Sequence, residues 1–380
     1  DTYGPLVYHQ LGETPRVYGQ QEAYTRFFAD LDEGQQLIRE YLDEGGDNNK
    51  FKEYDMLTNG KTLKEWLKFA NSLRLRLAMR ISNADATLAK DQATKALNDN
   101  QGVLEGARET IAVMGKNYIN PLCAVAGWGE VYMNASMESI VNGYEDPRGK
   151  KWYNTALLEG YQKQLLGIPI GLPMKDGDAN IYSFCSSLNT STIGEKTGAV
   201  LMSAAEVWLL RAEAALRGYT KENPRTCYEY GVSTSFTQWD CAGASEYLES
   251  DKTPADYKDV VSGGKVGKDM KALITISPKW EEDADIETKL EKIITQKWLA
   301  CWPESYEAWA EQRRTGYPKL FKVQNNTGKV IDTDIMIRRL PFSTDAATAD
   351  PAQYATLTEK LGGADNGATR LWWDTGKNSF

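Results

Sequence analysis

Aromatic residues are the chemically most informative feature of this chain, which contains 11 tryptophans and 20 tyrosines among 380 residues. Flat Trp and Tyr rings bind the apolar C–H faces of sugar rings, and they bind peptide side chains almost as well. Amide and carboxylate groups nearby would bind the hydroxyl rims of a sugar. Seven residues combine these properties, and we predict that they form a ligand site: Trp128, Tyr132, Asn134, Trp152, Tyr153, Asp178 and Tyr182. The alternative for each ring is a core or loop-anchoring role.

Catalytic motifs are missing from the sequence. His9 is the single histidine, and neither Gly-x-Ser-x-Gly nor His-Glu-x-x-His occurs. An acidic run could supply paired carboxylates for glycoside hydrolysis, but adjacent acids before a helix are typical of a solvated helix start. This run consists of Glu281, Glu282, Asp283 and Asp285. We therefore predict that the protein is not an enzyme.

The sequence also contains no complete motif for a cofactor or a metal ion. The stretch 262–269 lacks the first glycine and the Ser/Thr of a phosphate-binding loop. Asp176, Asp178 and Asn180 resemble the start of a calcium loop, but Ile181 stands where the turn glycine belongs. This departure excludes an EF-hand and leaves an irregular calcium site as an alternative. We predict no cofactor and no metal site.

The net charge of the chain makes nucleic acids and anionic membranes poor partners. The chain carries 44 Lys and Arg against 53 Asp and Glu, a net charge of −9, and no dense basic run. Nucleic acids and anionic lipid headgroups are therefore poor partners. The longest mostly apolar run, Ala199–Leu210, is interrupted by Glu206 and is shorter than the roughly 20 residues of a membrane span.

The five cysteines form no CxxC pair; we expect mainly buried free thiols, with a Cys227–Cys241 bridge as the alternative.

Helices must position the candidate ligand residues. Apolar residues recur every three or four positions from about Glu22 to Glu44, after a Thr62 cap, and over Ala86–Leu97. Helical periodicity returns over Gly198–Arg217, where alanines let a neighbouring helix approach closely. We further expect a short helix at Cys227–Phe236 and a helix over Ile286–Arg313 that is bent or split by Pro303. Four tryptophans lie on the apolar stripes of predicted helices, and we expect them to pack in the core: Trp66, Trp208, Trp298 and Trp309.

Six segments give the sequence a resemblance to the SusD/RagB family, the surface nutrient-binding lipoproteins of Bacteroidetes. They occur in the family's order and together span most of the chain: KTLKEWLKFANSLRLRLAMRISNADATLAKDQA (61–93), NGYEDPRGKKWY (142–153), LMSAAEVWLLRAEAALRGY (201–219), YEYGVSTSFTQW (228–239), IITQKWLACWPESYEAWAEQRRTGYPKL (293–320) and RRLPFSTDA (338–346). Within them we expect Asp146-Pro147-Arg148 to form a structural turn with a buried ion pair, and RRTGYP at 313–318 to anchor the helix before it.

The resemblance implies a mainly all-α fold of tetratricopeptide-like helical repeats with a loop-rich ligand region. We expect one SusD-like domain over 1–380, with helical repeats at about 22–100 and 198–315, an irregular ligand region at 103–195 and a turn-rich part at 316–380. Strand-like pieces are expected at Lys329–Arg338. Family members begin with a lipoprotein signal and a further helical section, so we expect this chain to be N-terminally incomplete, with any lipid anchor outside it.

The function implied by the resemblance is non-catalytic capture of oligosaccharides at the cell surface, in the outer membrane, for a SusC-like TonB-dependent transporter. Two alternatives are a peptide-capturing SusD/RagB-type protein and a helical-repeat scaffold that binds only protein. The residues themselves do not discriminate among glycans and peptides, because aromatic faces accept both.

Overall fold

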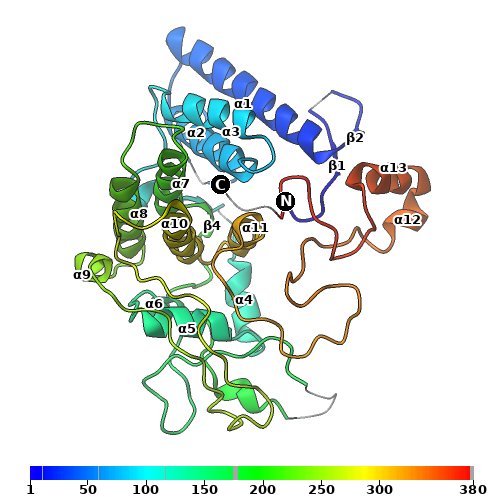
Figure 1. Cartoon of the computed structure of the whole chain (residues 1–380). Coiled ribbons are helices and arrows are strands. Elements are labelled where there is room, and N and C mark those ends of the chain that lie inside the picture. Colours follow the sequence, from blue (N-terminus) through cyan, green and yellow to red (C-terminus); the bar gives the residue numbers. More distant parts are fainter. Residues whose placement is uncertain (11, 59, 116, 174–178, 377–380) are drawn as a thin grey trace.

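The computed structural model describes residues 1–10, 12–58, 60–115, 117–173 and 179–376. Helices dominate this part of the chain, and its strands are short (Figure 1), as the predicted mainly α-helical class requires. The strands are β1 (Leu6–Tyr8), β2 (Arg16–Tyr18), β3 (Ile111–Val113) and β4 (Ala199–Met202). The helices are α1 (Gln20–Asp43), α2 (Leu63–Arg80), α3 (Ala86–Leu97), α4 (Pro121–Gly127), α5 (Ala135–Gly143), α6 (Gly149–Trp152), α7 (Ala204–Leu216), α8 (Pro224–Gln238), α9 (Ala244–Leu248), α10 (Ile286–Ala300), α11 (Ser305–Thr315), α12 (Ala346–Ala349) and α13 (Pro351–Leu361).

The first three predicted helices are confirmed as α1, α2 and α3, which pack in sequence order with α2 between the other two. Thr62 caps α2: its hydroxyl accepts the Glu65 amide hydrogen, and the Glu65 carboxylate accepts the Thr62 amide hydrogen. This reciprocal pair satisfies backbone donors that would otherwise lack partners at the start of the helix. A buried hydrogen bond of 2.6 Å between Gln35 and Asn71 joins α1 to α2.

The second helical region differs from its prediction at one end. Residues 199–202 form β4, antiparallel to β3, instead of the first turn of a helix, and α7 begins only after the Ser203 cap. The alternative backbone pairing with Ile111–Val113 outweighs the helical periodicity there. The predicted close approach of a neighbouring helix is confirmed for α8. At Gly231 of α8 the two helices are so close that a Cβ atom there would lie 2.6 Å from the Leu209 side chain of α7.

The predicted split at Pro303 is confirmed. Helix α10 ends at Ala300 and α11 starts at Ser305, and the Glu304 carboxylate caps α11 by accepting the Glu307 amide hydrogen at 2.9 Å. Proline has no backbone N–H and cannot continue the α10 hydrogen-bond ladder. The break turns the chain between the two helices and places Trp302 in the connection.

The C-terminal part contains a helix, α13, that the sequence did not predict, and its described residues form none of the predicted strands. Asp350 caps α13 by accepting the Gln353 amide hydrogen, with Pro351 at the first helical position. The described residues 329–338 form turns, including a bond from the Met336 amide to the Asp332 carbonyl, and no strand. The strand prediction was wrong: among the described residues this segment belongs to neither two-stranded sheet, and alternating side chains form no strand without backbone hydrogen bonds to a partner.

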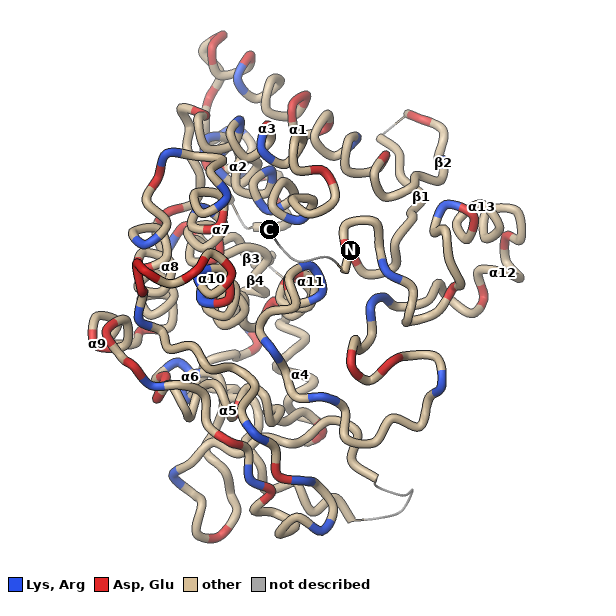
Figure 2. Tube along the Cα trace, in the orientation of Figure 1, with Lys and Arg blue, Asp and Glu red and all other residues tan. Residues whose placement is uncertain are grey.

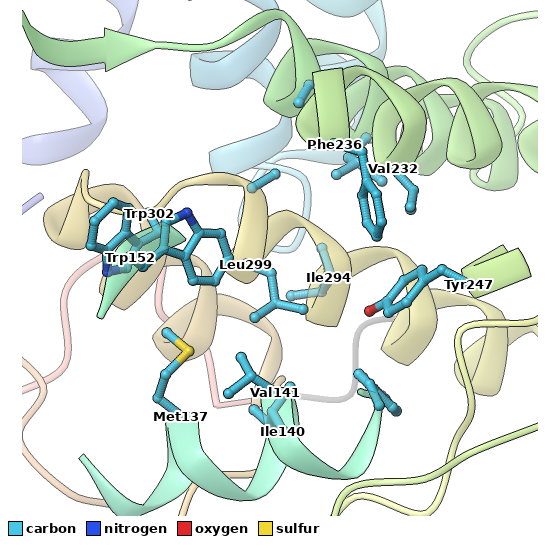
Figure 3. Packing of buried hydrophobic residues seen from close by; sticks show 14 of the residues in the cluster. Met137, Ile140, Val141, Trp152, Val232, Phe236, Tyr247, Ile294, Leu299 and Trp302 are labelled. Carbon is cyan, nitrogen blue, oxygen red and sulfur yellow. The ribbon is translucent and has the colours of Figure 1, made fainter. Parts of the chain in front are cut away.

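A large hydrophobic core holds the irregular middle region against α8 and α10 (Figure 3). The Trp152 ring stacks on Trp302 with centroids 5.1 Å apart and planes inclined by 20°, and meets the edge of Trp239. Helix α5 adds apolar side chains that face Ile294 and Leu299 of α10. All five cysteines are free thiols, so the alternative Cys227–Cys241 bridge is wrong.

The Asp146-Pro147-Arg148 segment forms the predicted turn with a buried ion pair. Arg148 and Asp146 have fully buried side chains and pair at 2.6 Å. The same guanidinium donates to Ser235 of α8 at 2.8 Å and to Gln296 of α10 at 3.1 Å. One arginine therefore fixes the position of the middle region relative to two helices.

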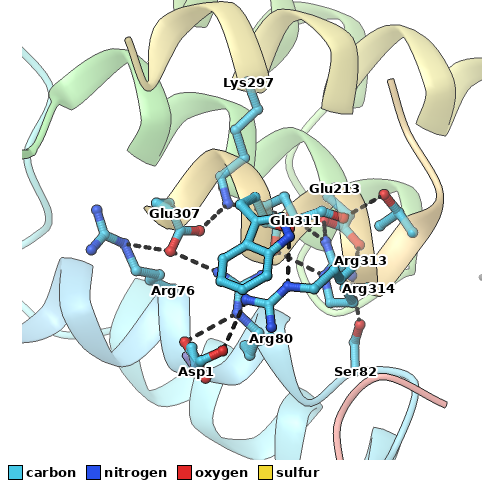
Figure 4. Close-up of polar contacts among 12 residues, drawn as sticks. Asp1, Arg76, Arg80, Ser82, Glu213, Lys297, Glu307, Glu311, Arg313 and Arg314 are labelled. Atoms are coloured by element: carbon cyan, nitrogen blue, oxygen red, sulfur yellow. Dashed lines mark hydrogen bonds and ion pairs between the residues drawn. The ribbon is translucent and has the colours of Figure 1, made fainter. Parts of the chain in front are cut away.

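A buried ion-pair network joins α2, α7, α10 and α11 (Figure 4). We define it as Arg76, Arg80, Glu206, Glu213, Lys297, Glu307, Glu311 and Arg314. Burial opposes ionisation of Glu307, but attraction to Arg80, Lys297 and Arg76 outweighs burial and lowers its pKa to about 2. The predicted anchoring of α11 by the RRTGYP segment is confirmed at Arg314, which pairs with Glu213 of α7 and Glu311.

The network predicts a loss of stability in acid. The folded-state pKa of Glu307, about 2, lies below its ordinary value of 4.5, so its contribution is complete above about pH 4.5 and is lost as the pH falls toward 2. For Glu307 alone this contribution is on the order of 3 kcal/mol. Urea unfolding at pH 7, 4 and 3 should show the free energy of unfolding falling steeply below pH 4.5. A Glu307→Gln variant should show a flatter dependence; an unchanged slope would contradict the assignment.

Candidate ligand-binding site

The seven predicted ligand residues lie in different environments. Asn134 and Tyr153 line one cavity. Trp128 and Tyr132 lie on the surface or near it, with Trp128 67% exposed at the end of α4. The Tyr132 hydroxyl donates to the Gly129 carbonyl at 2.7 Å, which holds the loop that carries Trp128. Asp178 lies outside the described residues.

Trp152 and Tyr182 are core residues, and the ligand contacts predicted for them do not fit their positions. Trp152 is completely buried and its ring is covered by Trp302 and Trp239. Tyr182 is 1% exposed; its hydroxyl lies 3.1 Å from the Asp259 carboxylate and accepts the Gly267 amide hydrogen at 3.0 Å. For these two rings the alternative role in the core holds, because they fill the space beneath irregular chain.

An aromatic pocket of about 370 Å³ is the cavity that brings predicted residues together. It lies between α5, the start of α4, the α10–α11 connection and the chain after α11. We call it the aromatic pocket; its described lining includes Leu122, Val131, Asn134, Met137, Tyr153, Trp298, Trp302, Glu304, Trp309, Gln312, Leu320, Met336 and Ile337. A volume of this size lies within the range of small-ligand sites, which are mostly apolar with a few polar groups.

Two tryptophans expected only to pack also line this pocket. Trp298 contacts the hydrophobic core and reaches the cavity from α10. Trp309 reaches it from α11 and is half-buried, with the Arg313 guanidinium carbon 3.6 Å from its ring centroid. One face of the Trp309 ring is therefore covered by a cation. The apolar stripe on which Trp298 lies does pack in the core, as predicted, but part of it also forms a wall of the cavity.

Polar groups of the pocket are positioned by helix starts and by Trp302. Asn134 caps α5 through its Oδ1 atom, which accepts the Met137 amide hydrogen at 2.9 Å. The Tyr153 hydroxyl accepts the Trp302 Nε1 hydrogen at 3.1 Å, and burial raises the pKa of Tyr153 to about 12, so this hydroxyl stays protonated. Burial raises the pKa of Glu304 to about 7, although Arg76 opposes this shift. The pocket therefore offers amide, hydroxyl and carboxyl groups at its apolar wall.

The acidic run before α10 has a structural role. Asp285 caps α10 by accepting the Thr288 amide hydrogen at 2.8 Å, and Glu281 pairs with Lys292 at 3.0 Å. This outcome confirms the solvated helix start. Within the described residues no group of three His, Cys, Asp or Glu is arranged to hold a metal ion, and no described helix is long and apolar enough to span a membrane.

Comparisons with known proteins place this architecture in a family. The family model described as SusD-like, Susd and RagB outer membrane lipoprotein, matches residues 1–374. A solved SusD homologue from Bacteroides vulgatus has 56% identity and a TM-score of 0.96, over 100% of this chain and 76% of its own. A chitin-binding SusD homologue from Flavobacterium johnsoniae has 35% identity and a TM-score of 0.93, over 100% of this chain and 78% of its own.

A SusD-like protein from Bacteroides thetaiotaomicron is similar at 31% identity and a TM-score of 0.89, over 98% of this chain and 77% of its own. The comparison with curated proteins gives no match. Fold, sequence and family model agree along almost the whole chain. The chain belongs to the SusD-like family of outer membrane lipoproteins.

Proposed function

We propose that this protein captures oligosaccharides at the cell surface, without catalysis, and delivers them to a SusC-like TonB-dependent transporter in the outer membrane. The family membership supports a nutrient-binding lipoprotein. The homologue described as chitin-binding, 35% identical over the whole of this chain, supports a saccharide ligand. The aromatic pocket is the proposed site.

The observation that carries the proposal is the composition of the pocket wall. Trp302, Trp309 and Tyr153 give it aromatic surface, and Asn134 and Gln312 add amide groups at the same cavity. Sugar rings combine apolar C–H faces with hydroxyl rims, so they match a wall of this kind on both counts. Asn134 keeps its Nδ2 hydrogens for a ligand, because in the described part of the chain only its Oδ1 is engaged.

The single carboxyl group among the described residues of the pocket wall favours binding over hydrolysis. Glu304 is the one carboxyl among the described lining residues. Most glycoside hydrolases use two carboxyl groups on opposite sides of the bond that breaks. Glu304 also caps α11 and is therefore held by the Glu307 amide.

Affinity-gel electrophoresis against a panel of polysaccharides, including soluble chitin derivatives, tests the proposal. The protein should be retarded by at least one polysaccharide and should release no product from it. A calorimetric titration with a peptide pool is the parallel measurement. Binding of peptides with no retardation by any polysaccharide would favour a peptide-capturing protein, and no ligand in either measurement would favour a protein-binding scaffold.

Replacing Trp309 with alanine should weaken saccharide binding about tenfold or more, equivalent to ~1.4 kcal/mol. Trp208→Ala is the matched control, since Trp208 is also half-buried on a helix and has an arginine guanidinium, that of Arg211, 3.7 Å from its ring centroid. Trp208 does not line the aromatic pocket. Calorimetric titration of both folded variants should show lost affinity for Trp309→Ala alone. Equal affinities would remove this wall from the site.

A further inference from the structure

A second cavity, of about 470 Å³, adjoins the aromatic pocket. Gln312, Leu320 and Met336 line both cavities, so the two share a wall. Lys and Arg recur along α11 and the chain that follows it (Figure 2). Six described lining residues of the second cavity are cationic and one, Asp334, is acidic; the cationic ones are Arg313, Arg314, Lys319, Lys322, Arg338 and Arg370. We call this space the cationic cavity.

Two guanidinium groups of the cationic cavity share a single carboxylate, and a third, that of Arg313, bonds to the backbone beside them. Asp374 accepts from Arg338 Nε and Nη2, both at 2.7 Å, and from Arg370 Nη1 at 2.6 Å. Arg313 bonds to the Arg338 carbonyl at 2.7 Å, and Arg338 bonds to the Arg313 carbonyl at 2.6 Å. The three arginines and one aspartate leave an excess of positive charge, in a protein whose net charge is −9.

The rim of the cationic cavity carries cations that an incoming ligand can reach. The side chains of Lys319, Lys322 and Arg370 are 48%, 56% and 34% exposed. Lys319 lies 3.4 Å from Glu291, and Lys322 pairs with Asp334, whose side chain is 73% exposed. The Lys322–Asp334 pair is exposed on both sides, and such a pair contributes only about 0–1 kcal/mol, so an anionic ligand can exchange for Asp334 at small cost.

We infer that the cationic cavity binds an anionic substituent of the captured oligosaccharide, a sugar carboxylate or a sulfate ester, while an adjacent sugar ring lies in the aromatic pocket. This inference rests on the proposed function and narrows its substrate class to acidic glycans. Guanidinium groups bind planar carboxylates and sulfate-like anions through paired hydrogen bonds, and Arg370 has donors for this, because its hydrogen bond to Asp374 uses Nη1. Lys319 and Lys322 add point charges. The net charge of −9 repels such a ligand on average, so a local group of cations favours binding at this place.

Two pairs of tetrasaccharides, in each of which one member carries fewer anionic groups, test the inference. The first pair is tetragalacturonate and its methyl ester, and the second is a chondroitin sulfate tetrasaccharide and its desulfated form. In calorimetric titrations the more highly charged member of at least one pair should bind at least tenfold more tightly. Its affinity should also fall with added salt. A preference confined to the first pair identifies a carboxylate site, and one confined to the second identifies a sulfate site.

A charge-removal variant identifies the residues responsible. Lys322→Gln combined with Arg370→Gln should lower affinity for the charged tetrasaccharide at least tenfold and leave that for its less charged partner unchanged. Arg338 still pairs with Asp374 in this variant, so the buried pair is kept. The control is Lys258→Gln with Lys271→Gln, which removes two exposed lysines that pair with Asp269 and Asp256. Neither lysine is among the described lining residues of the two cavities, so this variant should change neither affinity.

The measured affinities decide separately on the inference and on the proposed function. Equal affinity for both members of both pairs overturns the inference and leaves the proposed function standing. Unchanged affinity of the charge-removal variant for the charged tetrasaccharide also overturns it. If the protein binds none of the four tetrasaccharides and no polysaccharide retards it in the gel panel, the proposed function and the inference both fail.

Discussion

Replacing Arg314 with methionine is expected to lower the free energy of unfolding by about 3–5 kcal/mol, because it leaves buried carboxylates without a counter-charge. The Arg314 side chain is fully buried. It donates two hydrogen bonds to Glu213, at 2.6 and 2.8 Å, and two to Glu311, at 2.6 and 3.0 Å. A fifth bond, at 3.0 Å, reaches the hydroxyl of Ser82. All five N–H donors of the guanidinium are therefore used, and methionine replaces none of them.

Two further variants separate charge from geometry in the ion-pair network. Arg314→Lys keeps the charge but cannot reach both carboxylates with paired bonds, so its loss should be intermediate. Arg225→Met is the exposed control; Arg225 pairs with Glu229 at 2.7 Å, with both side chains more than one third exposed. That variant should lose less than about 0.5 kcal/mol. Urea unfolding measures all three, and an Arg314→Met protein within about 1 kcal/mol of the parent would refute the account.

Trp152→Ala is expected to cost about 3–5 kcal/mol of stability, the range for removal of a large buried aromatic side chain. The ring is completely buried, stacked on Trp302 and edge-on to Trp239. It sits where α6 meets the core that joins the middle region to α10. Its loss would leave a large cavity beneath Trp302, a residue that lines the aromatic pocket, so any weakened ligand binding would follow from the lost packing.

Trp128→Ala is the matched control for this prediction. Trp128 is 67% exposed, so its removal should change the free energy of unfolding by less than about 0.5 kcal/mol. Thermal unfolding of both variants distinguishes the two environments. A Trp152→Ala protein as stable as Trp128→Ala would place Trp152 at the surface and return it to the ligand site.

Local signals explain how much of the fold the sequence predicts. The Thr62 cap, the alanines of α7 and the break at Pro303 each act over a few residues, and the structure confirms the helices that they mark. The segment 199–202 was misassigned because its strand pairing depends on residues 111–113, which no local pattern reveals. The α13 helix was missed although Asp350 and Pro351 give it an ordinary start.

The candidate site was only partly predictable, for a physical reason. Asn134 and Tyr153 were named from their residue types, and both line the aromatic pocket. Trp309 and Glu304 were not, because a tryptophan on a helix stripe and an acid at a helix start also suit purely structural roles. A cavity is formed by several elements that meet in space, and the periodicity of one helix does not report which part of its stripe remains uncovered.

Fluorine NMR of the protein labelled with 5-fluorotryptophan tests the central claim most directly, since each of the 11 tryptophans gives its own signal. Signals are assigned with single Trp→Phe variants, and the protein is titrated with chitin tetrasaccharide and with the charged tetrasaccharides. A saccharide in the aromatic pocket should shift the signals of its lining tryptophans, Trp298, Trp302 and Trp309, and leave those of Trp66 and Trp208 in place. Saturating saccharide that moves none of the three pocket signals, or moves Trp128 alone, would contradict the account.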